Sequence, residues 1–175
     1  ARMDDLLFEQ LNEPYSMEAE QALLGAVLMN PACYTRVSGI VRPESFYIPQ
    51  HKAIFAAIAN LDYLNQKIDP LLVLEELKQN GTYDEAAGKN YLAQLAQSVP
   101  SVENVESYAR IIKEKYYLRT LMEAAEEMLK NAANEELSAD TIMDAAEQKI
   151  YNIRQGNKEN EPVRLSDILR DEVYD

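Results

Sequence analysis

A complete helix start is visible in Pro14-Tyr15-Ser16-Met17-Glu18-Ala19-Glu20-Gln21-Ala22-Leu23-Leu24-Gly25-Ala26-Val27-Leu28. Ser16 is placed to cap the free amide groups of the first turn, and Glu18 and Glu20 lie where the helix dipole favours negative charge. The three-and-four spacing that follows predicts one buried face, made of Ala19, Ala22, Leu23, Ala26 and Val27. Because Gly25 costs about 1 kcal/mol relative to alanine inside a helix, we expect close packing against a neighbouring helix to offset that cost.

The composition of the 175-residue chain favours helices over strands, with 5 Gly, 7 Pro and no Trp beside abundant Ala, Leu, Glu, Lys and Met. A formal net charge of -13 argues against a surface that neutralises nucleic-acid phosphates. It fits an acidic surface that keeps the protein in solution or meets a basic protein partner. The single cysteine, Cys33, excludes an internal disulfide. From the composition and the single cysteine we expect an all-α, cytoplasmic protein. We expect no membrane span, because no run of about 18 apolar residues occurs.

Prolines mark the expected helix starts in the first hundred residues, since proline at the first helical position loses no hydrogen bond. The expected elements are a segment over 31–40, a turn over 43–46 and helices over 49–64 and 70–79. A loop containing Gly88 then precedes a short helix over 89–97, which Pro100 ends.

A helical hairpin is predicted beyond Pro100. Residues 101–132 contain no Gly or Pro and predict one long helix, and a second helix over 139–155 follows a loop and a cap at Ser138. Each helix carries an apolar stripe, and the short loop between them predicts an antiparallel pair. The first stripe comprises Leu118, Leu121, Met122, Ala125, Met128, Leu129 and Ala132, and the second comprises Ile142, Met143, Ala146, Ile150 and Ile153.

The expected architecture is therefore a compact helical globule followed by a protruding antiparallel hairpin. Its parts are a flexible N-terminal arm (1–15), a globular subdomain (16–117), the hairpin (118–155), a polar linker starting at Gly156 (156–164) and a short final helix (165–175). Leu165, Ile168 and Leu169 form the apolar side of that final helix. With nothing of its own to pack on, this side is expected to dock on another domain or a neighbouring subunit.

The opening stretch resembles the N-terminal domain of bacterial DnaB-type replicative DNA helicases, which begins with a Pro-x-Ser-x-Glu-Ala-Glu-Gln run leading into Leu-Gly. Further matches follow in the family's order. They are Ser45-Phe46-Tyr47 with His51-Lys52-Ala53-Ile54-Phe55, Ile68-Asp69-Pro70 with Leu77 and Asn80-Gly81, Tyr91-Leu92-Ala93-Gln94-Leu95, Val99-Pro100-Ser101 with Asn104, Tyr108 to Lys115, and Arg119-Thr120-Leu121. The family more often has Val after the Asp where this chain has Pro70.

The resemblance implies a domain that pairs through its hairpins, forms a collar on a hexameric helicase ring, and binds the primase C-terminal domain and, in some bacteria, a helicase loader. It also identifies 165–175 as the start of the linker helix to an ATPase motor. The chain has no phosphate-binding Gly-x-x-x-x-Gly-Lys-Ser/Thr loop, because Gly88-Lys89 is followed by Asn90. ATP and Mg²⁺ are thus implied for the absent motor domain alone, and no cofactor for this chain. The alternative is a primase C-terminal helicase-binding domain, which has a related shape; the opening stretch and the final helix count against it.

No catalytic centre is expected in this chain. His51 beside Phe55 is typical of a hydrogen-bonded structural histidine, and no Cys/His cluster has zinc spacing. The candidate residues are instead partner-binding ones, because flexible methionines and exposed tyrosines suit protein interfaces. We expect at least one of Tyr116 and Tyr117 to be exposed. The candidates on the hairpin are Tyr116, Tyr117, Leu118, Leu121, Met122, Met128, Leu129, Ile142, Met143 and Ile150, with Leu165, Ile168 and Leu169 for linker docking.

Overall fold

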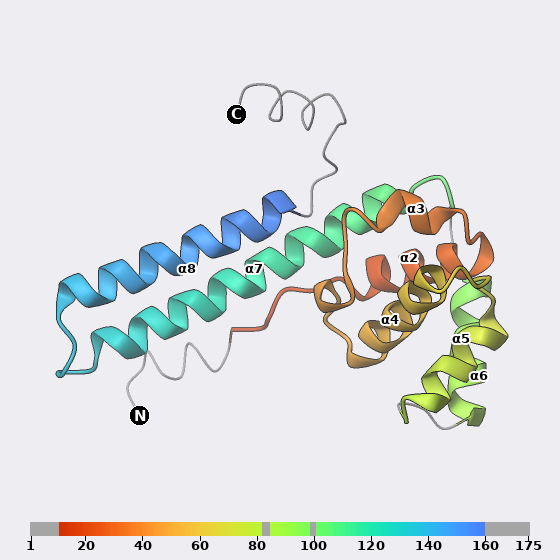
Figure 1. Cartoon of the computed structure of the whole chain (residues 1–175), viewed down its shortest axis with the longest axis horizontal. Helices are drawn as coiled ribbons and strands as arrows, with labels where there is room; N and C mark the ends of the chain where they lie inside the picture. Colours follow the sequence, from red (N-terminus) through yellow and green to blue (C-terminus); the bar gives the residue numbers. More distant parts are fainter. Residues whose placement is uncertain (1–10, 82–84, 99–100, 160–175) are drawn as a thin grey trace.

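The computed structural model describes residues 11–81, 85–98 and 101–159. These ranges contain seven α-helices and one short 3-10 helix. No strand occurs in these ranges. The helices are α2 (Met17–Met29), α3 (Cys33–Val37), η1 (Pro43–Ser45), α4 (Pro49–Tyr63), α5 (Pro70–Gln79), α6 (Glu85–Gln97), α7 (Val105–Ala132) and α8 (Ala139–Glu159). The all-α architecture of a head and a protruding hairpin is therefore confirmed (Figure 1).

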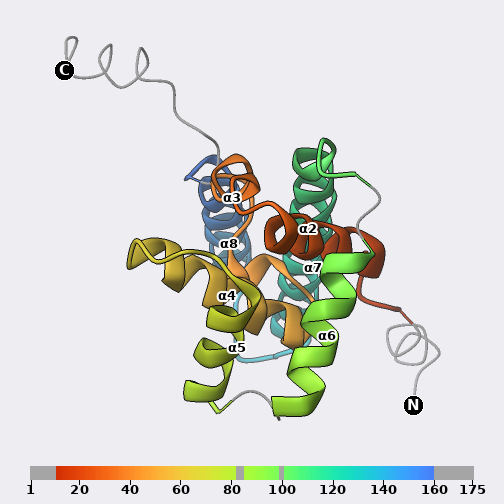
Figure 2. The same cartoon turned by 90° about the vertical axis from the view of Figure 1, so that its right-hand side faces the viewer.

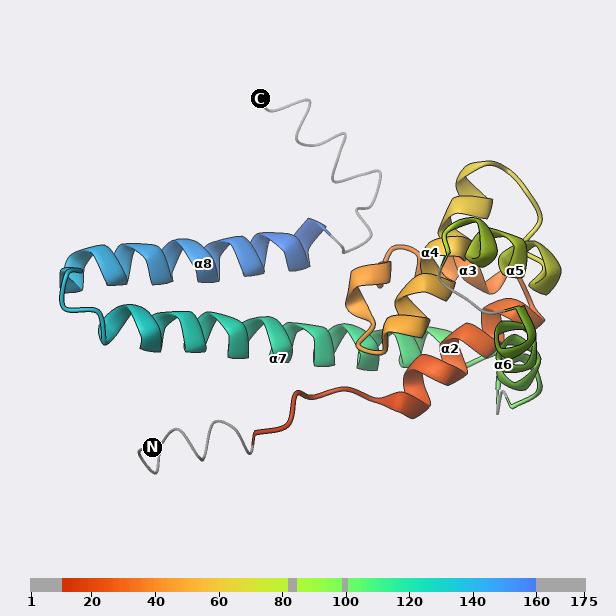
Figure 3. The ribbon, with the colours of Figure 1, turned by 90° about the horizontal axis from the view of Figure 1, so that it is seen from below.

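Helix α2 forms the centre of the head. Ser16 Oγ accepts a hydrogen bond from the amide of Ala19 at 3.1 Å, as the capping pattern predicts. From Ala22 to Leu28 every residue of α2 is buried, so apolar surface is covered on all sides of the helix and not on one face alone. Helices α4, α6 and α7 pack around it. Helices α5 and α6 lie at the end of the head opposite the hairpin tip (Figure 3), the end that faces the viewer in Figure 2.

Three proline-initiated elements begin where the sequence predicts. Pro43, Pro49 and Pro70 each occupy the first position of η1, α4 and α5, respectively. The Asp69 carboxylate caps α5 by accepting from the amide of Leu71 at 2.8 Å. Pro31 differs: it lies in a turn, and the helix of this segment spans only Cys33–Val37.

Other expected bounds were wrong. Helix α6 begins at Glu85, so Gly88 lies inside a helix and not in a loop. Helix α7 begins at Val105, four residues later than expected. Helix α8 continues through Gly156 to Glu159, so the first residues of the expected linker are helical. A single glycine costs only about 1 kcal/mol in a helix, and the neighbouring residues outweigh it at both positions.

Helices α7 and α8 form the antiparallel hairpin, and α7 also belongs to the head. Its first half packs on α2 and α3, and its second half projects beyond the head with α8 alongside (Figure 1, Figure 3). The expected boundary at residue 117 therefore falls inside one continuous helix. Lys149 Nζ lies 3.0 Å from Glu127 Oε2 and ties α8 to α7. Residues 1–10 of the arm, 160–164 of the linker and the final helix over 165–175 lie outside the described residues.

Candidate protein-protein interface

The apolar stripe on the outer half of α7 lies beside the seam with α8 and is not covered by that helix. Residues on α7 are separated by about 100° each, which places Leu118, Leu121, Ala125 and Leu129 within one narrow arc of the helix. The α7 residues that line the seam with α8 are Ala124, Glu127, Met128 and Asn131, on a different face of α7. The stripe centre is about a third of a turn away from that seam. Helix α8 consequently leaves the stripe open, and Leu121 and Leu129 are 43% and 53% exposed.

Helix α8 adds apolar side chains to the same side of the hairpin. Its seam residues are Ala145, Ala146 and Lys149, and Met143 and Ile150 lie on one flank of that seam. Because the two helices are antiparallel, this flank adjoins the open stripe of α7. We call the combined surface the apolar face of the hairpin, defined by Leu118, Leu121, Ala125, Leu129, Met143 and Ile150.

The ten candidate residues on the hairpin fall into two groups. Those exposed to solvent are Leu118, Leu121, Leu129 and Met143. Those half-buried are Tyr116, Tyr117, Met122, Met128, Ile142 and Ile150. The candidates for linker docking, Leu165, Ile168 and Leu169, lie outside the described residues.

The expectation that one of Tyr116 and Tyr117 is exposed was wrong. Both are half-buried, and their rings meet edge to face with centroids 5.4 Å apart. Burial raises the pKa of the Tyr116 hydroxyl above its ordinary value, and the nearby Glu44 adds to this effect. Both rings lie at the base of the hairpin, where α7 leaves the head.

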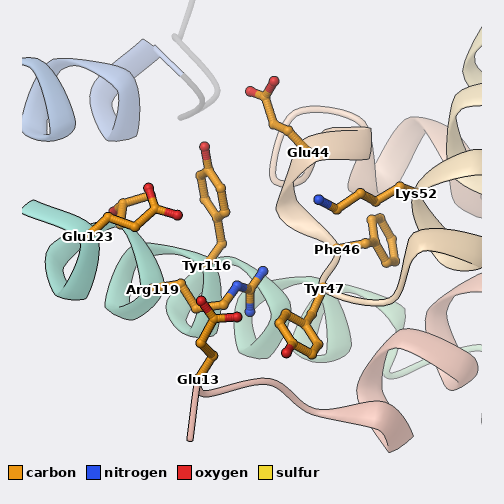
Figure 4. Close-up of a pocket in the computed structure, with 9 residues that line it drawn as sticks. Glu13, Glu44, Phe46, Tyr47, Lys52, Tyr116, Arg119 and Glu123 are labelled. Carbon is orange, nitrogen blue, oxygen red and sulfur yellow. The ribbon is translucent and has the colours of Figure 1, made fainter. Parts of the chain in front are cut away.

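Arg119 connects the base of the hairpin to the head, a role that its sequence context did not reveal. Its Nη1 donates to the Pro14 carbonyl oxygen at 2.7 Å, and its Nη2 donates to the Ser45 carbonyl oxygen at 2.9 Å. The guanidinium also lies over the Tyr47 and Tyr116 rings, as Figure 4 shows. One buried side chain thereby joins the base of the hairpin to the segment before α2 and to η1.

The described part of the N-terminal arm is held by the same junction. Tyr15 stacks on Tyr47 with ring centroids 4.4 Å apart, next to the Pro14 carbonyl that Arg119 binds. A hydrogen bond to the Glu13 carboxylate, together with its charge, raises the pKa of Tyr47. Residues 13–15 are thus bound to the head although they form no regular secondary structure.

Glu20 has a structural role that the helix-dipole argument missed. It is 1% exposed and accepts hydrogen bonds from the amides of Tyr47 and Ile48, at 2.9 and 3.3 Å. Its carboxylate also lies 2.7 Å from His51 Nδ1, so the lone histidine is a hydrogen-bonded core residue as its context suggests. The position of Glu20 in α2, beside Ala19 and Leu23 on the buried face, was the sequence signal that could have identified a buried carboxylate.

Within the described ranges, no group of three or more His, Cys, Asp or Glu side chains is arranged to hold a metal ion. No helix in these ranges is long and apolar enough to cross a bilayer. The feature that distinguishes the surface is the apolar face of the hairpin, since large exposed apolar patches on soluble proteins mark interaction sites.

Comparison with known proteins identifies the family. Residues 12–114 match the family model described as the DnaB-like helicase N terminal domain, and the chain belongs to this family. A protein named Replicative DNA helicase DnaB from Geobacillus stearothermophilus is 37% identical over 163 residues, covering 93% of this chain and 36% of that protein. The Rhodothermus marinus protein of the same name is 38% identical over 140 residues, covering 80% of this chain and 15% of that protein.

The fold comparison agrees with the sequence comparison. The crystal structure of the N-terminal domain of DnaB helicase from Mycobacterium tuberculosis superposes with a TM-score of 0.73 and 30% sequence identity, covering 81% of this chain and 99% of that one. The chain is therefore an N-terminal domain of the replicative DNA helicase type. It spans about a third of the length of its relative from Geobacillus stearothermophilus.

Proposed function

We propose that this domain is a non-catalytic assembly module that associates with copies of itself through the apolar face of the hairpin. The observation that carries this proposal is the exposure of Leu121, Leu129 and Met143 on one side of two adjoining helices. Burial of such side chains stabilises association by roughly 25 cal/mol per Å² of apolar surface removed from water. The family supports the same conclusion, because its named relatives are replicative helicases.

The rigid junction at Arg119 supports this role. An interface on a protruding hairpin is reproducible only if the hairpin keeps a constant orientation relative to the head. The continuous helix α7 provides that orientation, and Arg119 reinforces it through hydrogen bonds to two carbonyl oxygens and contacts with two rings. Association through the hairpins then sets the relative positions of the attached heads.

The wider role follows from the family. We propose that the parent protein is a bacterial, cytoplasmic ATP-dependent helicase acting in DNA replication. The domain contributes to the collar of its ring and docks the primase C-terminal domain and, in some bacteria, a helicase loader. We further propose that the chain holds no cofactor of its own, and that ATP and Mg²⁺ are bound by a separate motor domain. Strong direct binding to nucleic acid is not expected from a chain with a net charge of -13.

Sedimentation velocity tests self-association. We expect the wild-type chain to form a dimer or larger assembly that dissociates on dilution. The double variant Leu121→Glu/Leu129→Glu is expected to sediment as a monomer, since each substitution places a carboxylate at the centre of the apolar face. Leu71→Glu is the matched control, because Leu71 is a 65% exposed leucine on α5 in the head, and it should associate like the wild type.

Two results would contradict self-association through the hairpin. One is a wild-type chain that remains monomeric at high concentration, and the other is equal association of the hairpin variant and the wild type. Docking is tested separately by mixing the wild-type chain with a primase C-terminal domain. Absence of a faster-sedimenting complex there would refute the docking role and leave self-association to be judged by the first experiment.

A further inference from the structure

A basic groove of about 620 Å³ lies between α3 and the first half of α7. Arg36 and Ile40 line it from the α3 side, and Glu106, Arg110 and Lys113 line it from α7. Arg36 Nε lies 3.0 Å from one oxygen of Glu106, and Arg110 Nη2 lies 3.8 Å from the other. Lys113 forms no ion pair within the described ranges, so three cations of the groove face one carboxylate. In a chain with a net charge of -13, this groove favours an acidic occupant.

The hairpin tip, residues 133–138, is an exposed acidic loop between α7 and α8. It contains Glu135 and Glu136 and no lysine or arginine, and the neighbouring Leu137 is 37% exposed. Asn134 Oδ1 accepts a hydrogen bond from the amide of Glu136 at 3.0 Å, and the Asn134 carbonyl oxygen accepts one from the amide of Leu137 at 3.2 Å. These bonds hold the loop in a defined shape, which lowers the conformational entropy lost when it docks.

The tip cannot reach the groove of its own chain. The two features lie near opposite ends of α7, which is one continuous helix of 28 residues (Figure 3). At 1.5 Å per residue this helix is about 42 Å long, and it keeps the tip and the groove apart. The tip can therefore enter this groove only from a second copy of the chain.

Self-association through the apolar face of the hairpin allows two arrangements. Two identical patches that contact each other are related by a two-fold axis, which leaves the hairpins either parallel or antiparallel. Parallel hairpins place the two tips side by side, so that Glu135 and Glu136 of both chains bring four carboxylates together without a cation among the loop residues. Antiparallel hairpins place each tip near the head of the other chain. Repulsion between like charges therefore disfavours the parallel pair.

The register of the antiparallel pair brings the tip to the groove. The α7 part of the apolar face is centred between Leu121 and Ala125. Arg110 and Lys113 lie about 15 to 20 Å from that centre toward the head, at 1.5 Å per residue. The last residue of α7, Ala132, lies about 13 Å from the centre on the other side, and the tip continues outward from it. Arg110 precedes Leu121 by about three helical turns, so it lies on the same line of α7 as the apolar face.

We propose that the hairpin tip of one chain docks on the basic groove of a second copy, so that the paired hairpins run antiparallel. The two carboxylates of the tip pair with Arg110 and Lys113, and Leu137 contacts Ile40. This inference rests on the self-association proposed above, to which it adds the orientation of the partner. Because each tip binds the groove of the other chain, the contact is made twice in each pair.

Charge reversal in the full 175-residue chain tests this contact, with dissociation constants measured by sedimentation equilibrium. The groove variant is Arg110→Glu/Lys113→Glu, and the tip variant is Glu135→Lys/Glu136→Lys. Each should raise the dissociation constant about tenfold, which corresponds to about 1.4 kcal/mol for four exposed ion pairs. An equimolar mixture of the two variants should associate about as tightly as the wild type, because each tip then meets a groove of opposite charge.

The matched control is Lys67→Glu/Lys89→Glu, which makes the same change in net charge as the groove variant at exposed positions of the head. It should retain the dissociation constant of the wild type. If the tip variant associates as tightly as the wild type, the docking contact is overturned while the apolar face remains, since parallel hairpins give this result. A mixture that associates no more tightly than its components would also overturn the contact. A wild-type chain that remains monomeric at high concentration would overturn both this contact and the self-association on which it rests.

Discussion

His51 Nδ1 lies 2.7 Å from Glu20 Oε1, although the two residues are 31 positions apart and belong to different helices. On its other side, His51 Nε2 lies 2.6 Å from the hydroxyl oxygen of Tyr91 on α6. Because a carboxylate only accepts hydrogen bonds, the proton of the ring is placed on Nδ1, which donates to Glu20. Nε2 then accepts a hydrogen bond from the Tyr91 hydroxyl. Three helices of the head are thus joined by one buried polar chain.

Replacing Glu20 with glutamine should destabilise the head. Three donors converge on the Glu20 carboxylate, from the amides of Tyr47 and Ile48 and from the His51 ring. The side-chain amide of glutamine would place its own N–H donors against at least one of these three donors, where no hydrogen bond can form. We expect Glu20→Gln to lower the free energy of unfolding by about 1–3 kcal/mol in urea titrations. Glu18→Gln, at an exposed position of the same helix, should change it little; equal effects would refute the buried network.

Replacing Arg119 with lysine should destabilise the protein. The guanidinium donates in two directions, to the carbonyl oxygens of Pro14 and Ser45, and an ammonium lacks this planar fork. We expect Arg119→Lys to lower the free energy of unfolding by about 1–3 kcal/mol, because a buried acceptor loses its partner. Arg154→Lys on the exposed surface of α8 is the control. If both variants have the same denaturation midpoint, Arg119 does not fix the hairpin to the head.

Two glycines provide a matched pair for backbone conformation. A Cβ atom would meet nothing within 4 Å at either Gly81 or Gly156. Gly156 lies inside α8, so Gly156→Ala should raise the free energy of unfolding by up to about 1 kcal/mol. Gly81 has φ of +66°, a conformation that alanine rarely adopts, so Gly81→Ala should lower it. Thermal unfolding of the two variants checks the opposite signs; a loss at Gly156 would contradict its helical assignment.

Stability should fall at alkaline pH. Burial raises the pKa of the Cys33 thiol, and this effect outweighs the opposing charge of Arg36. The folded state therefore holds the thiol proton more tightly than the unfolded state. As pH rises above about 8.5, the unfolded chain loses this proton first, and the free energy of unfolding decreases.

Urea titrations between pH 7 and 10 check this decrease. Burial also raises the pKa of Tyr34, which contributes in the same direction at higher pH. Cys33→Ala removes the thiol contribution and should reduce the decrease with pH while keeping the tyrosine part. An identical pH dependence in the variant and the wild type would show that the thiol is not responsible.

Local signals predicted several elements well. Helix α5 runs over Pro70–Gln79, the same bounds as expected, because proline and a capping aspartate start it and Asn80-Gly81 stops it. Ser16 caps α2 for the same reason. These signals act between residues two to four positions apart, and such contacts can be identified without the rest of the fold. The ordered family motifs extended this information to the head and hairpin architecture.

The interface could be predicted only in part. The apolar stripe of α7 and the methionine on α8 were visible as periodic patterns. The pattern could not tell which face α8 covers, because the register between two helices depends on how their side chains pack. Met128 faces the seam, whereas Leu121 and Leu129 remain open.

The amino-acid sequence by itself determined the helical class, the family and the starts of most helices, since these depend on local spacing and on the order of motifs. The tertiary structure alone decided that Glu20 is buried beside His51, that Arg119 joins the hairpin to the head, and that α8 continues through Gly156. The physical reason is that desolvation and side-chain pairing act between residues that are distant in the chain, and their energies exceed the local preferences that a sequence pattern records.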